Sequence, residues 1–316
     1  MKNEMIFAFF LQISNHMWLD GAYPHKPYWA QDEWDENNNC DIDTWDRVVD
    51  FIAERKYNML VVDVGDGVKL DSHPEIAAPD AWSKEFLRKK LDELRAKGIE
   101  PIPKMNFSCC HNVWQKEWRY KIGLSQYMDF ARDIITEVCE LFGNPRFFHL
   151  GLDEETYEHQ AKYGIAIVRN EPVFWKDAYA LFDICEKNGA RPWVFSDYFI
   201  HHPEIFEKRM PKSVIQSNWY YGAFNPDPKY ANACWITPYR RFEELGYDQI
   251  PTFSTWSVDK NPIQGVRYCK EVISPEHLLG FNEIPWHNTT ASAYYTLISD
   301  AERLYQGRQI YFPETL

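Results

Sequence analysis

The chain has 316 residues, 26% of them charged, and a formal net charge of −13. Its hydrophobic fraction of 45% is typical of a folded protein and excludes global disorder, a collagen and a coiled coil. The negative charge repels polyanions, so we expect neither nucleic acid nor an anionic membrane surface as a partner. No stretch of the sequence is long enough to span a membrane.

Aromatic residues make up 16% of the chain, and 13 of them are Trp. Flat side chains with a polar edge suit partly wet surfaces, and the C–H faces of sugar rings stack on such planes. An aromatic-rich core would account for the same composition. The seven Cys form no CxxC pair, which favours buried thiols in a reducing compartment over a disulfide framework or a zinc ribbon. We therefore expect a cytoplasmic protein, or a periplasmic or secreted one if a signal peptide was removed.

Short apolar runs alternate with longer amphipathic runs along the whole chain. The first apolar run is short and lacks a small-residue cleavage site, so it indicates a core strand rather than a signal peptide. The expected strands are 5–13, 59–64, 100–106, 147–152, 192–197, 214–219, 251–256 and 278–284. The expected helices are 44–56, 83–97, 124–142, 172–188, 203–209, 240–245, 263–272 and 289–306.

The helix expected over 83–97 illustrates the signals. Ser83 can cap the free N–H groups at its start, and Gly98 can adopt the left-handed conformation that ends it. Leu87, Leu91 and Leu94 recur at helical spacing and predict one buried stripe.

Eight such strand–helix units indicate a single (β/α)8 barrel domain over residues 1–316. A doubly wound sheet is the alternative, but no GxGxxG or GxxxxGK[ST] loop follows any expected strand. We expect no bound cofactor.

Catalytic residues of such barrels follow the C-terminal ends of the strands. The fourth strand is followed by three consecutive carboxylates, Asp153, Glu154 and Glu155. Adjacent carboxylates raise each other's proton affinity, so we expect one acid and one anion at the same site. Glycoside hydrolysis needs this combination. A solvated acidic loop is the alternative for the triplet taken alone.

The ends of the last four strands combine carboxylates with aromatic residues. They carry Asp197, Trp219, Tyr220, Trp256, Glu283 and Trp286. We expect Trp219, Trp256 and Trp286 to line a concave acidic site that grips a sugar. For Glu283, a role in capping a helix is the alternative.

A divalent metal site and a cysteine nucleophile are two further hypotheses. The metal ligands would come from Asp63, Asp66, His111, His149, Asp153 and Glu154. No HxH or HExxH spacing supports such a site, and we expect no metal. A Cys–His pair at 109–111 is disfavoured because residues adjacent in sequence rarely reach the required geometry.

The segment His149-Leu150-Gly151-Leu152-Asp153-Glu154 resembles the H-x-G-G-D-E motif of family 20 glycoside hydrolases, the β-N-acetylhexosaminidases. Four other parts of the chain resemble the same family in the same order. They are 56–60 with Asp66, 98–103 with His111, 191–197 with its terminal Asp197, and Glu283 on the last strand.

The resemblance implies a retaining, substrate-assisted mechanism, in which the 2-acetamido oxygen of the sugar attacks the anomeric carbon. Asp153 would orient that group, Glu154 would protonate the leaving oxygen, and His111 would tune Glu154 from behind. Glu283 would hold sugar hydroxyls. Asp66, His149 and Asp197 are further expected binding residues, and the partner would be a glycan.

The chain also departs from the family pattern at several positions. Leu152 replaces the second Gly of the motif, Asn15 and His16 stand where the family has a sugar-binding Arg, and Phe281 replaces a closing Trp. We therefore expect a different subsite for the terminal sugar, with Asn15 and His16 among its residues. A barrel that binds a glycan without cleaving it is the alternative function.

Overall fold

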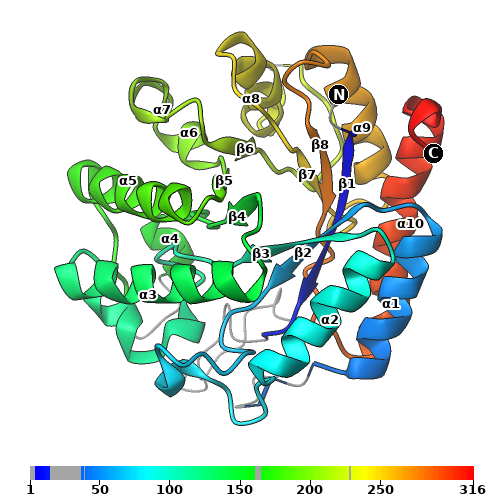
Figure 1. Cartoon of the computed structure of the whole chain (residues 1–316). Helices are drawn as coiled ribbons and strands as arrows, with labels where there is room; N and C mark the ends of the chain where they lie inside the picture. Colours follow the sequence, from blue (N-terminus) through cyan, green and yellow to red (C-terminus); the bar gives the residue numbers. More distant parts are fainter. Residues whose placement is uncertain (1–3, 15–36, 39, 161–164, 228) are drawn as a thin grey trace.

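The protein is described by a computed structural model that covers residues 4–14, 37–38, 40–160, 165–227 and 229–316 (Figure 1). Its centre is a sheet of eight parallel strands in the order β6-β5-β4-β3-β2-β1-β8-β7. The strands are β1 (Ile6–Gln12), β2 (Met59–Asp63), β3 (Glu100–Lys104), β4 (Phe147–His149), β5 (Arg191–Phe195), β6 (Ile215–Ser217), β7 (Thr252–Phe253) and β8 (Gly280–Glu283).

Backbone hydrogen bonds also join β6 to β7, the two strands at the ends of this order. Ile250 N donates to Gln216 O over 3.0 Å, and Thr252 N donates to Asn218 O over 2.9 Å. The sheet thereby closes on itself, and the predicted (β/α)8 barrel is confirmed.

Helices surround the strands on the outside of the barrel (Figure 1). The longer ones are α1 (Ile42–Glu54), α2 (Lys84–Ala96), α3 (Ser125–Leu141), α5 (Glu171–Lys187), α7 (Pro203–Arg209), α8 (Ala233–Glu244), α9 (Asn261–Val272) and α10 (Tyr294–Tyr311). Shorter ones are α4 (Tyr157–Gln160), α6 (Tyr198–His201) and the 3-10 helices η1 (Pro74–Ile76), η2 (Val113–Lys121), η3 (Ala291–Ala293) and η4 (Pro313–Thr315). Among the described helices, none has the length and apolar character needed to cross a membrane.

The residues expected to begin and end the helix over 83–97 do so in α2. The Ser83 hydroxyl accepts a hydrogen bond from Phe86 N over 3.1 Å, and Gly98 has a φ of +76° beyond the last turn. Helix α8 begins seven residues before the expected start at Arg240. The reason is Pro238, which lies inside the helix although proline usually ends one.

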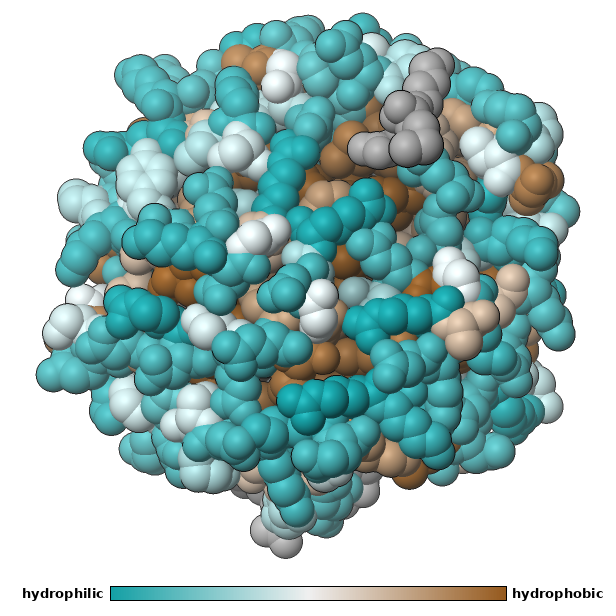
Figure 2. All heavy atoms as spheres, in the orientation of Figure 1, coloured by the Kyte–Doolittle hydropathy of each residue, from teal (hydrophilic) through white to brown (hydrophobic). Residues whose placement is uncertain are grey.

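Alternating strand residues build two cores. Ile6, Ala8 and Phe10 of β1 point into the barrel, where they join apolar side chains of other strands. Phe7 and Phe9 point outward and pack under the helices. Polar groups lie among the strand ends, where Lys104 donates to Asp63 Oδ2 over 2.7 Å. The face of the molecule in Figure 2 is mainly hydrophilic, with apolar side chains visible between the polar ones.

The same alternation decides where Glu283 lies. Phe281, two residues earlier in β8, belongs to the core under the helices, while Ile284 points into the barrel. Glu283 is fully buried beside Asp300 of α10. Burial raises the pKa of Glu283 well above its usual range, and the neighbouring Asp300 raises it further. The predicted contact of Glu283 with sugar hydroxyls therefore has no support in the structure, because its side chain faces a helix.

We predict that Glu283→Gln stabilises the protein at pH 8. Burial also raises the pKa of Asp300, to about 6. Carboxyl groups with raised pKa values stabilise the fold below their unfolded-state pKa and lose that contribution as the pH rises through the folded-state pKa. A neutral amide removes one such group, so the melting temperature should rise by at least about 2 °C at pH 8, where 1 kcal/mol corresponds to roughly 2–4 °C.

At pH 4.5 the melting temperatures of the two proteins should differ much less, because both carboxyl groups are then mostly protonated. Thermal denaturation followed by circular dichroism at both pH values measures the effect. A variant destabilised at pH 8 would show that Glu283 is an anion that the fold needs.

Candidate active site

The loop that follows β4 has an unusual backbone. Gly151, Leu152 and Glu154 have φ values of +70°, +66° and +56°. A Cβ atom on Gly151 would lie 2.1 Å from the Asn106 side-chain oxygen, so only glycine fits there. For the two non-glycine residues, this conformation costs on the order of 1–3 kcal/mol each and needs support from the surroundings.

Side chains from the two neighbouring strand ends supply that support. Asn106, after β3, accepts a hydrogen bond from Leu152 N over 3.3 Å. Asp197, after β5, accepts one from Glu154 N over 2.8 Å. The loop is thus tied on both sides, and it directs the side chains of Asp153 and Glu154 to the C-terminal mouth of the barrel.

Asp153 is a buried anion in this arrangement. Its Oδ1 accepts a hydrogen bond from Asn106 Nδ2 over 2.8 Å, and its Oδ2 lies 3.3 Å from His111 Nε2. Burial acts to raise the pKa of Asp153, but His111 outweighs it and the pKa is lowered. Both carboxylate oxygens are therefore oriented by neighbours rather than free to rotate.

Two histidines hold the carboxylate of Glu154. Oε2 lies 3.0 Å from Nε2 of His111, and Oε1 lies 3.2 Å from Nε2 of His159 in α4. Burial acts to raise the pKa of Glu154, but the hydrogen bonds from His111 and His159 outweigh it and hold this pKa well below its usual range.

The expectation that Asp153 keeps Glu154 protonated is therefore wrong for the unliganded protein. The pKa shifts favour protonated imidazoles beside ionised carboxylates instead. Burial acts to lower the pKa of His111, but Asp153 and Glu154 raise it to about 10. The hydrogen bond to Glu154 likewise raises the pKa of His159. Such a cluster exchanges protons as a unit.

Asp197 links the acid loop to the aromatic residues. Its Oδ2 accepts from the Glu154 backbone, and its Oδ1 accepts from the Trp219 indole Nε1 over 3.2 Å. Burial and the nearby charge of Asp153 raise the pKa of Asp197 to about 7.

Some of the aromatic residues at the strand ends lie close to one another. Trp219 and Trp286 are half-buried, and both pack against the inner core of the barrel. Tyr221 connects them, with its ring stacked on Trp219 at 5.1 Å and 6.5 Å from Trp286. Trp256 is also half-buried, with its ring 6.0 Å from His287.

Tyr221, and not the predicted Tyr220, faces the acids. Burial raises the pKa of the Tyr221 phenol, and the charges of Asp153, Glu154 and Asp197 raise it further, so the phenol lies within their electrostatic reach. Tyr220 points the other way, toward Phe224 and Asn232. Successive side chains of an extended segment point to opposite faces, so Tyr220 and Tyr221 have different neighbours.

Glu155 has a different partner from the two preceding acids. Its carboxylate binds the buried Arg169 and accepts a hydrogen bond from Cys109 N over 3.0 Å. Arg169 also lies 3.4 Å from Asp177 of α5. The triplet of carboxylates thus divides into two site residues and one structural residue.

The remaining predicted binding residues lie deeper or outside the described residues. Asp66 is fully buried and accepts a hydrogen bond from the Ser14 hydroxyl over 2.5 Å. His149 is fully buried inside the barrel against Trp193 and Phe195. Neither is accessible to a ligand in this conformation. The predictions for Asn15 and His16 fall outside the described residues.

The six residues considered as metal ligands do not form one cluster. Asp63 is paired with Lys104, Asp66 with Ser14, and His149 lies within the barrel. The ligand atoms that do gather belong to Cys110, His111 and Glu154, and all lie within 4.8 Å of one another.

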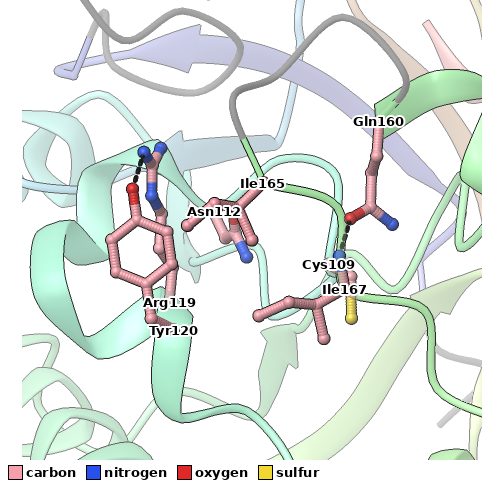
Figure 3. A pocket seen from close by; sticks show the side chains of 7 residues that line it. All are labelled: Cys109, Asn112, Arg119, Tyr120, Gln160, Ile165 and Ile167. Carbon is pink, nitrogen blue, oxygen red and sulfur yellow. Dashed lines mark hydrogen bonds between the residues drawn. The ribbon is translucent and has the colours of Figure 1, made fainter.

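A small cavity lies beside this region, next to the segment that carries His159 (Figure 3). Its walls include Cys109, Asn112, Gln160 and Ile167, and its volume is about 10 Å³. That volume holds about one water molecule, so a sugar does not fit there. We place the candidate site at the barrel mouth instead.

Comparison with known proteins supports the fold assignment. No protein-family model and no curated protein sequence matches the chain. Several solved structures do match the chain. A family 20 catalytic module of the pneumococcal exo-β-D-N-acetylglucosaminidase StrH has a TM-score of 0.60 at 14% identity, over 98% of this chain and 84% of that one.

Two further structures agree. The β-N-acetylhexosaminidase of Bacteroides fragilis has a TM-score of 0.60 at 13% identity, over 98% of this chain and 71% of that one. A Streptomyces plicatus β-hexosaminidase variant with bound N-acetylglucosamine has a TM-score of 0.61 at 13% identity, over 99% and 69%. The chain has the fold of these catalytic domains. This likeness matches the family that the β4 motif resembles.

We predict that Glu155→Ala strongly destabilises the protein, because it leaves the buried Arg169 without its main partner. Removing one member of a buried ion pair typically costs about 3–5 kcal/mol. Glu158→Ala is the matched control, since Glu158 is an exposed neighbour. Urea denaturation of both variants measures the difference, and equal midpoints would contradict the structural role of Glu155.

We also predict a titration near pH 7 in the fluorescence of Trp219, because its indole N–H donates to Asp197 and the pKa of Asp197 is about 7. The signal is the difference between the pH-dependent emission of the wild type and of Asp197→Asn. A difference spectrum that stays constant from pH 5 to pH 9 would contradict the raised pKa.

Proposed function

We propose that the protein is a retaining glycoside hydrolase that acts on glycans containing N-acetylhexosamine, with the 2-acetamido group of the substrate as the nucleophile. Glu154 protonates the leaving oxygen and Asp153 orients and stabilises the attacking acetamide. The structural neighbours support this proposal, since their names describe enzymes for N-acetylglucosamine or N-acetylhexosamine.

One observation carries the substrate-assisted form of the proposal. Every carboxylate described near Glu154 is already held by the protein. Asp153 is oriented by Asn106 and His111, and Asp197 by the Glu154 backbone and Trp219. A carboxylate nucleophile must approach the anomeric carbon closely. Among the described residues, none of these carboxylates has that freedom, so a nucleophile within the substrate fits better.

The pKa pattern suggests how Glu154 obtains its proton. In the unliganded site Glu154 is an anion between two imidazoles with raised pKa values. A sugar that covers the loop excludes water and raises the cost of separated charges. The proton then passes from an imidazole Nε2 to the Glu154 carboxylate and on to the leaving oxygen.

Tyr221 and Trp286 complete the proposed sugar site. The Tyr221 phenol forms a hydrogen bond with Trp286, and it lies within the electrostatic reach of Asp153. A phenol O–H can donate to the acetamide oxygen or to a ring hydroxyl, and the indole plane can stack on a sugar ring. Trp286 is one of the predicted binding residues, and in this proposal Tyr221 takes the role that was predicted for Tyr220.

A metal-dependent hydrolase is the second candidate, favoured by the gathering of Cys110, His111 and Glu154. Exhaustive dialysis against EDTA separates the two. The glycosidase proposal expects unchanged hydrolysis, whereas loss of activity that Zn²⁺ restores would favour the metal.

The decisive prediction compares two variants on two kinds of substrate. Glu154→Gln should lose about 10²–10⁴-fold in rate on oligosaccharides, since a positioned acid contributes that much. It should largely spare activated aryl glycosides, whose leaving groups need little protonation. Asp153→Asn should impair both kinds, because it acts on the ring side of the reaction. Steady-state kinetics give the rates, with Glu158→Gln as the control for an exposed neighbouring acid.

Equal losses on both substrate kinds in Glu154→Gln would refute the acid assignment. Wild-type hydrolysis of glycosides that lack the 2-acetamido group would refute the substrate-assisted mechanism. If the wild type hydrolyses no glycan at all, the barrel that only binds glycans would become the better reading.

A further inference from the structure

We propose that Cys110, His111 and Glu154 form an inhibitory Zn²⁺ site at the mouth of the barrel. An ion held there occupies the carboxylate of Glu154 and stops hydrolysis, so the ion acts as a reversible inhibitor and not as a cofactor. The effect on hydrolysis rests on the proposed function of Glu154 as the acid, whereas binding of the ion does not.

The donor atoms of these three residues lie together because they follow neighbouring strands. Cys110 and His111 come after β3, and Glu154 comes after β4, which pairs with β3. One donor atom of each residue lies within 4.8 Å of the other two. Cys110 and His111 are only 2% and 4% exposed, while Glu154 is half-buried. The cluster is therefore enclosed on the side of the thiol and open to solvent on the side of the carboxylate.

The backbone that carries the thiol is fixed on both sides. Cys109 N donates to Oε1 of Glu155 over 3.0 Å, and the buried Arg169 binds the same carboxylate. His111 N donates to the Ser108 hydroxyl over 3.0 Å. An incoming ion thus meets donors that the fold already holds in place, which lowers the entropic cost of binding.

The spacing of the donors suits a small ion. Nε2 of His111 lies 3.0 Å from Oε2 of Glu154 and 3.3 Å from Oδ2 of Asp153. Two ligands at the usual Zn–N and Zn–O distances of a tetrahedral site lie roughly 3.3 Å apart. The imidazole and the carboxylate are already close to this spacing, and a shift of about 1 Å completes the site with the thiol. Asp153 places a second negative charge beside the ion.

The chemistry of the donors favours zinc over the hard divalent cations. Thiolate, imidazole and carboxylate are the donor types of protein zinc sites, and three of them leave a fourth position for water. Mg²⁺ and Ca²⁺ prefer sites built from oxygen donors alone. A cluster with a sulfur and a nitrogen donor therefore discriminates against both of these ions.

Zn²⁺ bound in this way disables the acid. The oxygen lone pairs of Glu154 that would accept the proton are then engaged by the ion, so the carboxylate has no proton to give to the leaving oxygen. The ion also withdraws His111 from Asp153, which orients the attacking acetamide in the proposed mechanism. Removal of the ion restores both contacts, and the inhibition is reversible.

Binding is tested first, in the absence of any substrate. The reduced wild type is titrated with Co²⁺, which takes the place of Zn²⁺ and gives a near-ultraviolet charge-transfer absorption when a thiolate binds it. We expect this absorption in the wild type and its loss when excess Zn²⁺ is added. Cys110→Ala should abolish it. Cys234→Ala is the matched control, since Cys234 is an exposed cysteine on α8, and it should keep the absorption.

Calorimetric titration with Zn²⁺ gives the affinities. Loss of a residue that merely supports a metal ligand costs about 10–100-fold in affinity, so Cys110→Ala should raise the Kd by at least about 100-fold. Glu154→Gln should raise it by at least about tenfold, with the exposed Glu158→Gln as its control, and keeps the test valid if Cys110→Ala does not fold. A folded Cys110→Ala or Glu154→Gln that binds Zn²⁺ as tightly as the wild type would overturn the inference, as would a wild type that binds no Zn²⁺.

Inhibition is measured on the hydrolysis of N,N′-diacetylchitobiose. The rate with saturating Zn²⁺ is divided by the rate without it for each protein, so that a change in the basal rate of a variant cancels. In the wild type this ratio should fall about 10²–10⁴-fold below one, the contribution of a positioned acid, and EDTA should restore it. Cys234→Ala should behave like the wild type. Inhibition of the same size in Cys110→Ala would overturn the inference.

The activity assay separates failure of this inference from failure of the proposed function. Activity that EDTA removes and Zn²⁺ restores would overturn the inference, because the ion would then be a cofactor. Zn²⁺ that binds to the wild type without lowering the rate would overturn the inhibitory role. A wild type that hydrolyses no glycan would refute the proposed function, and the Co²⁺ and Zn²⁺ titrations would then decide alone whether the site exists.

Discussion

The left-handed conformation of the loop after β4 is the constraint on which the candidate site depends. This backbone turns Asp153 inward to Asn106 and His111, and Glu154 toward two imidazoles. Because Asn106 follows β3 and Asp197 follows β5, the neighbouring strands of the barrel hold the loop on both sides. The closed sheet therefore fixes the position of the two acids. A shift in the register of β3 or β5 would move Asn106 or Asp197 away from the loop.

The sequence predicted the barrel and the place of the acids well, and the reasons are local. Alternating apolar runs, a cap such as Ser83 and a stop such as Gly98 are each visible in a short window. Beyond the last hydrogen-bonded residue of a strand, the direction of a side chain is no longer set by a visible pattern. For this reason the sequence pattern does not distinguish Tyr220 from Tyr221. Helix α4, which carries His159, has only four residues and gives no periodic signal.

The protonation state of the site could not be predicted from the sequence for a different reason. Adjacency of Asp153 and Glu154 suggested mutual repulsion and a raised pKa. In the folded protein, the nearest groups to Glu154 come from 43 residues earlier and from five residues later, and both are histidines. The pKa of a carboxyl group in a folded site depends on which charged groups lie near it in space, and not on its neighbours in the sequence. The three consecutive carboxylates therefore have three different sets of partners. Glu155, bound to the buried Arg169, belongs to the scaffold.

The departure at Leu152 shows how a motif can change while its geometry is kept. The resemblance places a glycine there, and the observed φ of +66° explains that preference, because glycine adopts it without strain. Leucine accepts a strain of on the order of 1–3 kcal/mol at this position. Its side chain is 3% exposed and belongs to the core beneath the helices, and burying a leucine contributes about 1.5–3 kcal/mol. The two effects are of similar size, so the loop keeps the conformation that the acids require. The missing glycine is therefore no argument against catalysis.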